Sequence, residues 1–516
     1  METEDKLYEL IHTLDKSEKG FVKKLATLYS KEEANGARLF DIYNNVKEYD
    51  KKKIDQLVQK EKFANRVAVT KHYLYELILR GLKSYYSEKK DLYILKTQIQ
   101  YAEILKDKGL YKQAFTIVKK AKKIGLHNEI YFPLIELIAI ERAMFRVYDA
   151  NPNELELLAK LSVEEEKKYK YLIEGILFFE KTCFQVTKFA HDMGREERIV
   201  IIDKFDQILN SDEYQNYLYL SSKKIKLLHQ NVVVFNHFIR QEEIAFEREG
   251  QTLLNMAMDK KQSHPLNPRW IIQFVNNFAV AAAQFHNLEL FVKCIESLED
   301  LKKEIDDSRD FIYQLAETCL INLNCIYFFL SGDFKSGLKD SKLHLQKEML
   351  NINAITDSMA STYLNKSIFH FLLGEYHDAI KALNAIELYT EQHTTPYVDS
   401  ECYLIKILSH IELGNTEIAL YLTKLYKALL EKESLAFQQR KILVDTIIEN
   451  PWAEKNTIAE KTFLLIKEKN IATDACFGEI LINVFLWCDC VCNKKSFTLE
   501  YQSQSAKKIT YTSIEV

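Results

Sequence analysis

A group of cysteines near the carboxyl end, Cys488, Cys490 and Cys492, has the residue type of a metal site. Zinc sites usually take cysteines in pairs separated by about two to four residues, with a second pair elsewhere. Cysteines that alternate along a helix point in different directions around its axis. Cys476 is the nearest candidate for a fourth ligand. The spacing favours buried core thiols over a metal centre, and we expect no metal and no cofactor.

The 13 histidines are scattered, and none belongs to a His-Glu-x-x-His sequence. The glycine-rich phosphate-binding loops and the Gly-x-Ser-x-Gly turn of hydrolases are also missing from the sequence. His370 and His377 flank a glycine, and we expect the first to be a packing residue and the second a surface residue. The sequence therefore predicts no enzyme, and an enzyme with an unrecognised helical site is the least favoured alternative.

A basic run ends one predicted helix and comprises Lys119, Lys120, Lys122 and Lys123. Cations in the last turns of a helix interact favourably with its dipole. Residues 1–125 hold 27 Lys and Arg against 18 Asp and Glu, a net charge of +9, and the remainder carries −13. A basic surface can attract nucleic acid or an acidic protein. We interpret the run as a solvated helical face, with contact to nucleic acid as the alternative.

The composition indicates an all-α protein. The chain has 516 residues, of which only 13 are Gly and 6 are Pro, and 47% are hydrophobic. Long helices joined by short loops need few turn residues, whereas sheet proteins need many. The nine cysteines and the acidic start without an apolar segment behind it predict a cytoplasmic protein with reduced thiols. No apolar run is long enough for a membrane span, so we expect no membrane contact.

The clearest local pattern is Gly374 followed by Tyr376 and Ala379, and similar patterns occur at three other glycines. A glycine can adopt the left-handed conformation that ends a helix. The aromatic residue fills the gap to the previous hairpin, and the small residue lets two helices approach closely. The expected packing residues are Gly109, Tyr111, Ala114, Gly332, Phe334, Gly374, Tyr376, Ala379, Gly414 and Ala419.

The pattern recurs at intervals that suit a helical repeat. The turns at 286, 332, 374 and 414 are 46, 42 and 40 residues apart. Tetratricopeptide repeats have a period of ~34 residues, and solenoids with longer helices ~40–47. A single hairpin cannot bury both of its faces, so neighbouring hairpins must stack. The intervals therefore predict hairpins with long helices and irregular spacing.

These residues resemble those of tetratricopeptide-repeat proteins over roughly 270–430, with one further unit at 92–124. The resemblance implies a right-handed superhelical α-solenoid whose groove binds a partner protein or peptide. The chain departs from the repeat pattern at Ser367 and His370, at Thr416 in place of an aromatic residue, and at Gly337 in place of alanine. No counterpart of the repeat's clamp for carboxylate-ended peptides is identifiable. The resemblance does not name the partner.

The sequence predicts five regions and two local helix signals. Gly125 is expected to end a helix, and Ser162 with Glu165 to form a capping box that starts one.

The main function predicted is that of a protein-binding scaffold. The alternative is a regulator whose basic amino-terminal half contacts nucleic acid while the repeats sense a peptide. The regions are a helical leader at 1–90, helical hairpins at 91–260, the repeat array at 261–435, carboxyl-terminal helices at 436–492 and a polar tail at 493–516.

Overall fold

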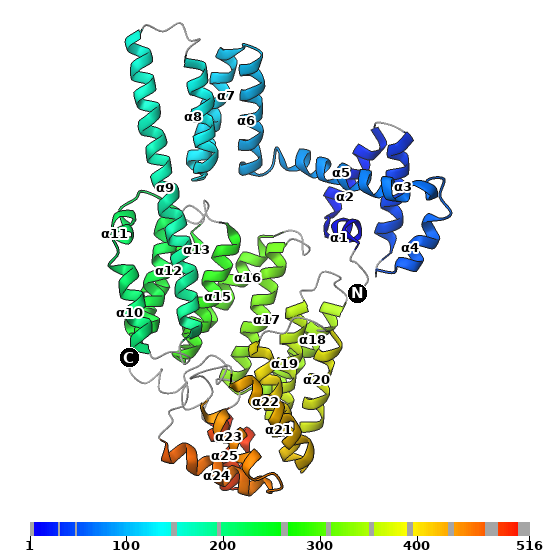
Figure 1. The fold of residues 1–516 in the computed structure, drawn as a ribbon, viewed down its shortest axis with the longest axis vertical. Helices are drawn as coiled ribbons and strands as arrows, with labels where there is room; N and C mark the ends of the chain where they lie inside the picture. Colours follow the sequence, from blue (N-terminus) through cyan, green and yellow to red (C-terminus); the bar gives the residue numbers. More distant parts are fainter. Residues whose placement is uncertain are drawn as a thin grey trace.

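The protein is built from helices throughout the part that the structure describes. Within that part no strand occurs, which confirms the all-α class. None of these helices is both long and apolar enough to cross a membrane. The structure is a computed structural model that describes residues 5–28, 31–46, 49–145, 152–192, 198–259, 267–305, 311–349, 356–389, 396–431, 438–469 and 483–503 (Figure 1).

The first helices enclose a core of their own. Leu7, Phe40, Tyr43 and Leu74 are buried at its centre. In Figure 1 this group lies beside the rest of the molecule, and α5 leads from it to the second group. Its elements are α1 (Lys6–Thr13), α2 (Lys16–Leu28), α3 (Lys31–Asn45), α4 (Lys51–Val58), a 3₁₀ turn (Ala64–Arg66) and α5 (Val67–Tyr86).

A second and a third core follow, and one helix of 41 residues belongs to both. The amino-terminal half of α9 contributes Leu172 to the second core, and its carboxyl-terminal half contributes Phe179 and Val186 to the third. The second core is built by α6 (Asp91–Asp107), α7 (Tyr111–His127), α8 (Tyr131–Phe145) and α9 (Pro152–Asp192). The third adds α10 (Arg198–Leu209), α11 (Asp212–Leu218), α12 (Lys223–Arg240), α13 (Glu243–Met258), α15 (Pro268–Gln284) and α16 (Leu288–Lys303).

The fourth core is joined to the third by α17 (Phe311–Ser331), which gives Leu320 to the third and Phe329 to the fourth. The boundaries between neighbouring cores thus lie inside the helices α9 and α17. The predicted regions remain predictions, although residue 90 does lie between the first and second cores. The helices of the fourth core are α18 (Phe334–Met349), α19 (Thr356–Leu372), α20 (Tyr376–Tyr389), α21 (Pro396–Glu412), α22 (Thr416–Leu430), α23 (Gln438–Glu449), α24 (Lys455–Glu468) and α25 (Val484–Cys492).

Consecutive helices pack as hairpins, and the hairpins contact one another through their first helices. The pairs α15 with α16, α17 with α18, α19 with α20 and α21 with α22 are each in contact. In addition α15 packs on α17, α17 on α19, and α19 on α21. Each hairpin therefore shares an interface with the next, as a stack requires.

The hairpin turns share one backbone geometry. Gly109, Gly332, Gly374 and Gly414 have φ between +72° and +77°, the left-handed conformation that glycine adopts without strain. Gln241 and His286 occupy the same conformation without being glycine. At every one of these turns except that of Gly332, the next N–H donates to the carbonyl five residues earlier, at 2.8–3.1 Å. This bond closes the end of the first helix.

Two local predictions are wrong. Gly125 does not end a helix, because α7 continues to His127. A Cβ at Gly125 would lie 2.5 Å from Leu134 Cδ2, so the glycine allows α7 and α8 to approach closely. Ser162 does not start a helix either, because it lies inside α9 and its hydroxyl donates to the Ala159 carbonyl at 2.8 Å.

Candidate functional site

The carboxyl-terminal part of the chain contacts the turns at Gly332, Gly374 and Gly414, which join helices of the fourth core. We call residues 483–503 the C-terminal strap; it comprises α25 and a short helix at 497–503. The two are joined by a turn in which Lys494 has φ 51° and Lys495 N–H donates to the Cys490 carbonyl at 2.8 Å. The strap contacts the three turns in reverse order of sequence.

At the Gly414 turn, Glu412 receives donors from other elements. Trp487 Nε1 of the strap donates to Glu412 Oε1 at 2.8 Å, and Lys455 Nζ of α24 donates to Oε2 at 2.9 Å. Burial raises the pKa of Tyr376, and the charge of Glu412 with a hydrogen bond to it adds to the shift. Glu412 is 10% exposed, so these donors compensate a carboxylate that is largely removed from water.

At the other two turns the strap contacts aromatic rings and main-chain oxygens. The Thr498 hydroxyl donates to the Leu372 carbonyl, and the Phe497 ring lies 6.0 Å from that of Phe371. Gln502 Nε2 donates to the Gly332 carbonyl at 2.8 Å, and the Tyr501 ring lies 5.7 Å from that of Phe334. The last carbonyls of a helix have no partner within the helix, and two of the strap's side chains supply them.

Part of the predicted polar tail belongs to the strap. Residues 497–503 are helical and packed, since Phe497 and Tyr501 join the fourth core. The tail is rich in Ser, Thr and Gln. Its contact with the fourth core comes from two aromatic residues one helical turn apart. Residues 504–516 lie outside the described residues.

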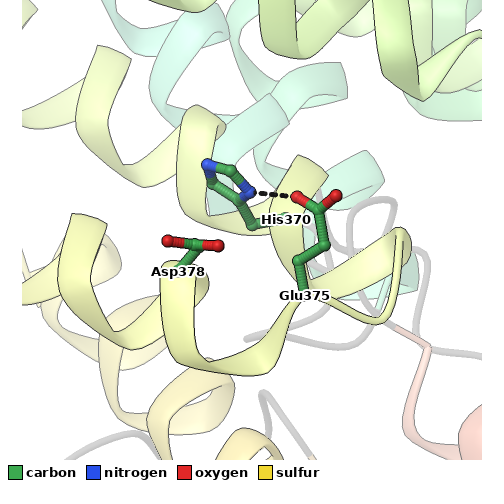
Figure 2. A group of neighbouring side chains, drawn as sticks. All are labelled: His370, Glu375 and Asp378. Carbon is green, nitrogen blue, oxygen red and sulfur yellow. Dashed lines mark hydrogen bonds and ion pairs between the residues drawn. The ribbon is translucent and has the colours of Figure 1, made fainter.

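A histidine and two carboxylates meet at the Gly374 turn (Figure 2). His370 Nδ1 lies 2.6 Å from Glu375 Oε2, and one ligand atom from each of His370, Glu375 and Asp378 falls within 4.8 Å of the others. His370 is 7% exposed at its side chain and Glu375 is 47% exposed. As expected, His370 is buried and His377 is exposed.

At two other turns a histidine is likewise paired with the side chain five residues later. His237 Nδ1 lies 2.6 Å from Glu242 Oε2, and His410 Nδ1 lies 3.3 Å from Asn415 Nδ2. In each case the second residue also donates its N–H to the carbonyl of the histidine. The pair therefore stabilises the turn by two bonds, one from the backbone and one from the side chain.

Of these three turns, only that of Gly374 adds a third ligand. Ala245 and Ile418 occupy the positions equivalent to Asp378. The donor set of one imidazole and two carboxylates suits a divalent ion such as zinc or manganese. The recurrence of the pair without the third ligand makes turn stabilisation a sufficient explanation for His370 and Glu375.

The predicted packing residues lie at the hairpin turns. Ala114, Ala379 and Ala419 are at most 2% exposed, as close approach of two helices requires. Phe334 is buried, whereas Tyr111 and Tyr376 are half-buried. At Gly337 a Cβ would lie 2.4 Å from Phe369 Cζ, which explains why glycine replaces alanine in that hairpin.

The basic run is divided by the structure. Lys119, Lys120 and Lys123 are exposed. Lys122 Nζ instead lies 2.6 Å from Glu141 Oε2 and 2.7 Å from Glu165 Oε2, so it joins α7 to α8 and α9. Its charge is matched by two carboxylates, and three lysines of the predicted basic patch remain on the surface.

The cysteines at the carboxyl end do not point to one place. Cys488 and Cys490 are buried and Cys492 is exposed, while Cys476 lies outside the described residues. Burial raises the pKa of Cys490 to about 11, and that of Cys183 and Cys294 to about 12. A protonated thiol is a poor nucleophile and a poor metal ligand.

A buried ion pair between α21 and α23 was not predicted. Arg440 Nη2 donates to Glu401 Oε1 at 2.6 Å, and both side chains are 0% exposed. Arg440 Nη1 donates to Ser400 Oγ at 3.2 Å, and Ser400 Oγ lies 2.8 Å from the Tyr426 hydroxyl. The sequence signal was weak, since a single arginine in an apolar helix reads as a surface residue.

No family model matches the chain, and neither a curated protein nor a solved structure matches it.

Proposed function

We propose that the chain is a scaffold that binds a partner protein or peptide, and that its hairpins form a right-handed, tetratricopeptide-like superhelix. The observation that carries the proposal is the contact of each first helix with the next, from α15 through α17 and α19 to α21. The shared left-handed turns and the buried Ala379 and Ala419 support the same arrangement. A stack of this kind presents one continuous row of first helices to a partner.

The proposal includes a binding rather than a catalytic role and a place in the cytoplasm. Burial raises the pKa of Cys183, Cys294 and Cys319, to about 12, 12 and 11, so these thiols are protonated at neutral pH. The cysteines of the described residues are free rather than paired in disulfides. Free thiols are typical of a reducing compartment.

Cross-linking of the full-length chain to captured partners, followed by mass spectrometry, tests the proposal. Lys366 on α19 and Lys406 on α21 report on the array, and Lys119, Lys120 and Lys123 report on α7. We expect partner cross-links at the first two lysines. Cross-links confined to α7, or a chain that captures no partner, would contradict the proposal.

A regulator that contacts nucleic acid is the second candidate, supported by the exposed Lys119, Lys120 and Lys123. Because Lys122 is held by Glu141 and Glu165, this surface is smaller than the sequence indicated. Binding of this kind falls steeply with salt. If the candidate holds, replacing the three exposed lysines by glutamine abolishes binding to a labelled duplex, whereas Lys381→Gln on α20 leaves it unchanged.

A further inference from the structure

The short helix of the strap is held by its contacts rather than by its own stability. It spans residues 497–503, and isolated helices shorter than ~12–15 residues are marginal in water. It is joined to α25 by exposed residues at 493–496, one of which, Lys494, has the left-handed conformation that non-glycine residues disfavour. A segment of this kind opens at a lower free-energy cost than the core beneath it.

The surface under this helix is apolar and carries acceptors. Phe334 is 1% exposed and Phe371 is 2% exposed. The carbonyls of Gly332 and Leu372 receive the Gln502 amide and the Thr498 hydroxyl. Removing the helix would take Tyr501 from the Phe334 ring and Phe497 from the Phe371 ring, and would leave both carbonyls to water.

The contacts of the strap's short helix show what chemistry fits this surface. Phe497 and Tyr501 are four residues apart, and so are Thr498 and Gln502, so each pair lies on one face. The aromatic pair contacts Phe371 and Phe334, and the polar pair reaches the carbonyls. Leu499, which is 67% exposed, takes no part.

We propose that this surface, formed by Phe334, Phe371 and the carbonyls of Gly332 and Leu372, is a docking site for a short amphipathic helix of a partner protein, and that residues 497–503 occupy it within the chain. The partner helix carries two aromatic residues one turn apart and, beside them, a hydroxyl and an amide donor. It displaces the strap's helix and makes the same contacts. The inference rests on the proposed binding role and assigns to it a surface and a partner chemistry.

Competition between the strap and a free copy of its own helix tests this inference. The probe is a fluorescently labelled peptide of residues 493–505, and its anisotropy is measured with full-length chains. In the variant Phe497→Ala/Tyr501→Ala the surface is vacated, so we expect the probe to bind at least tenfold more tightly than to the wild-type chain. The matched control Leu499→Ala changes the exposed face of the same helix and should bind the probe like wild type.

The receptor side is tested at two glycines of equal backbone strain. Gly332 and Gly414 both have positive φ. A Cβ at Gly332 would lie 3.2 Å from Gln502 Cγ, whereas a Cβ at Gly414 would have no neighbouring atom within 4 Å. In the vacated variant, Gly332→Ala should weaken probe binding severalfold more than Gly414→Ala. Circular dichroism confirms that each variant remains folded.

Equal probe binding by wild type and the vacated variant, or binding by neither at millimolar peptide, would overturn the inference. So would equal effects of the two glycine substitutions. These outcomes are distinct from failure of the proposed function. Partner cross-links at Lys366 and Lys406 would persist if only the docking site were wrong.

Discussion

At the scale of single residues, the left-handed position of each turn determines where one helix ends and the next begins. Four of these positions are glycine, but Gln241 and His286 also adopt positive φ. A non-glycine residue pays a conformational cost of roughly 1–2 kcal/mol there. The histidine pair at 237 and 242 adds a side-chain bond at such a turn. Side-chain support of this kind offsets part of the strain.

Ala379 tests the close approach of α19 and α20. Its side chain is 0% exposed, so a larger residue must displace its neighbours. We expect Ala379→Leu to lower the free energy of unfolding by about 1–3 kcal/mol, measured by urea denaturation. Ala428→Leu on the exposed face of α22 is the control and should change it by less than about 0.5 kcal/mol. A neutral result at Ala379 would mean that the helix crossing lies elsewhere.

His229 makes stability depend on pH. Burial lowers its pKa, while the charge of Glu249 acts weakly in the opposite direction, and its ring lies 5.9 Å from Phe179 and 5.8 Å from Tyr214. A lowered pKa means that the folded state favours the neutral ring. This contribution is present above the unfolded pKa of about 6.5 and is lost as pH falls through the folded value.

We therefore expect His229→Phe to reduce the loss of stability between pH 7 and pH 5, measured as the urea midpoint at each pH. His72→Phe, at an exposed histidine of α5, is the control and should leave the pH dependence of the urea midpoint as in wild type. If His229→Phe keeps the full dependence on pH, other groups such as His12, whose pKa burial also lowers, account for it.

At the scale of elements, one carboxylate links the turn between α7 and α8 to the start of α12, in addition to the connection that α9 makes between the second and third cores. Glu129, in the turn between α7 and α8, lies at the amino end of α12. Its carboxylate accepts from the Ser222 hydroxyl at 2.6 Å, from Lys223 N at 2.7 Å and from Lys224 N at 3.1 Å. The free N–H groups of a helix start and its dipole both favour a negative charge.

Glu129→Gln keeps the shape and removes the charge. We expect faster amide exchange in the first turn of α12 and a loss of about 1–3 kcal/mol in unfolding free energy. Hydrogen exchange with mass spectrometry measures the first effect. Glu136→Gln, at an exposed residue of α8, is the control and should leave exchange in α12 unchanged. Unchanged exchange in Glu129→Gln would show that the charge of Glu129 does not stabilise the first turn of α12.

Helix content and the glycine turns were predictable because low Gly and Pro content and helical spacing are properties of short stretches. The attachment at Glu129 was not, since it joins residues 93 positions apart in the sequence. The strap was missed for a related reason. Its polar residues donate to main-chain carbonyls. Every residue has such a carbonyl, so the sequence does not show which one is the acceptor. Ser162 was misread because packing extends α9 through a local start signal.

At the scale of the whole molecule, the cores follow one another in chain order and share helices. The second and third cores meet within α9, and the third and fourth within α17. Sharing a helix couples neighbouring cores more tightly than a loop does. Among the described residues, the first and second cores share no helix, and the Tyr86 ring of α5 stacks on the Tyr93 ring of α6. Within this part of the chain, the first core is thus coupled to the second less tightly than the other cores are to their neighbours.

The length of α9 has a mechanical consequence. Its 41 residues extend over roughly 60 Å at ~1.5 Å per residue. Figure 1 shows α9 running from the helices of the third core to those of the second core, α6 to α8. The part of α9 that precedes Phe179, its first buried residue in the third core, is roughly 40 Å long. Tilting α9 by roughly 5° at the third core would move its amino end by roughly 3–4 Å. A small rearrangement in the third core would therefore displace the helices of the second core by a larger distance.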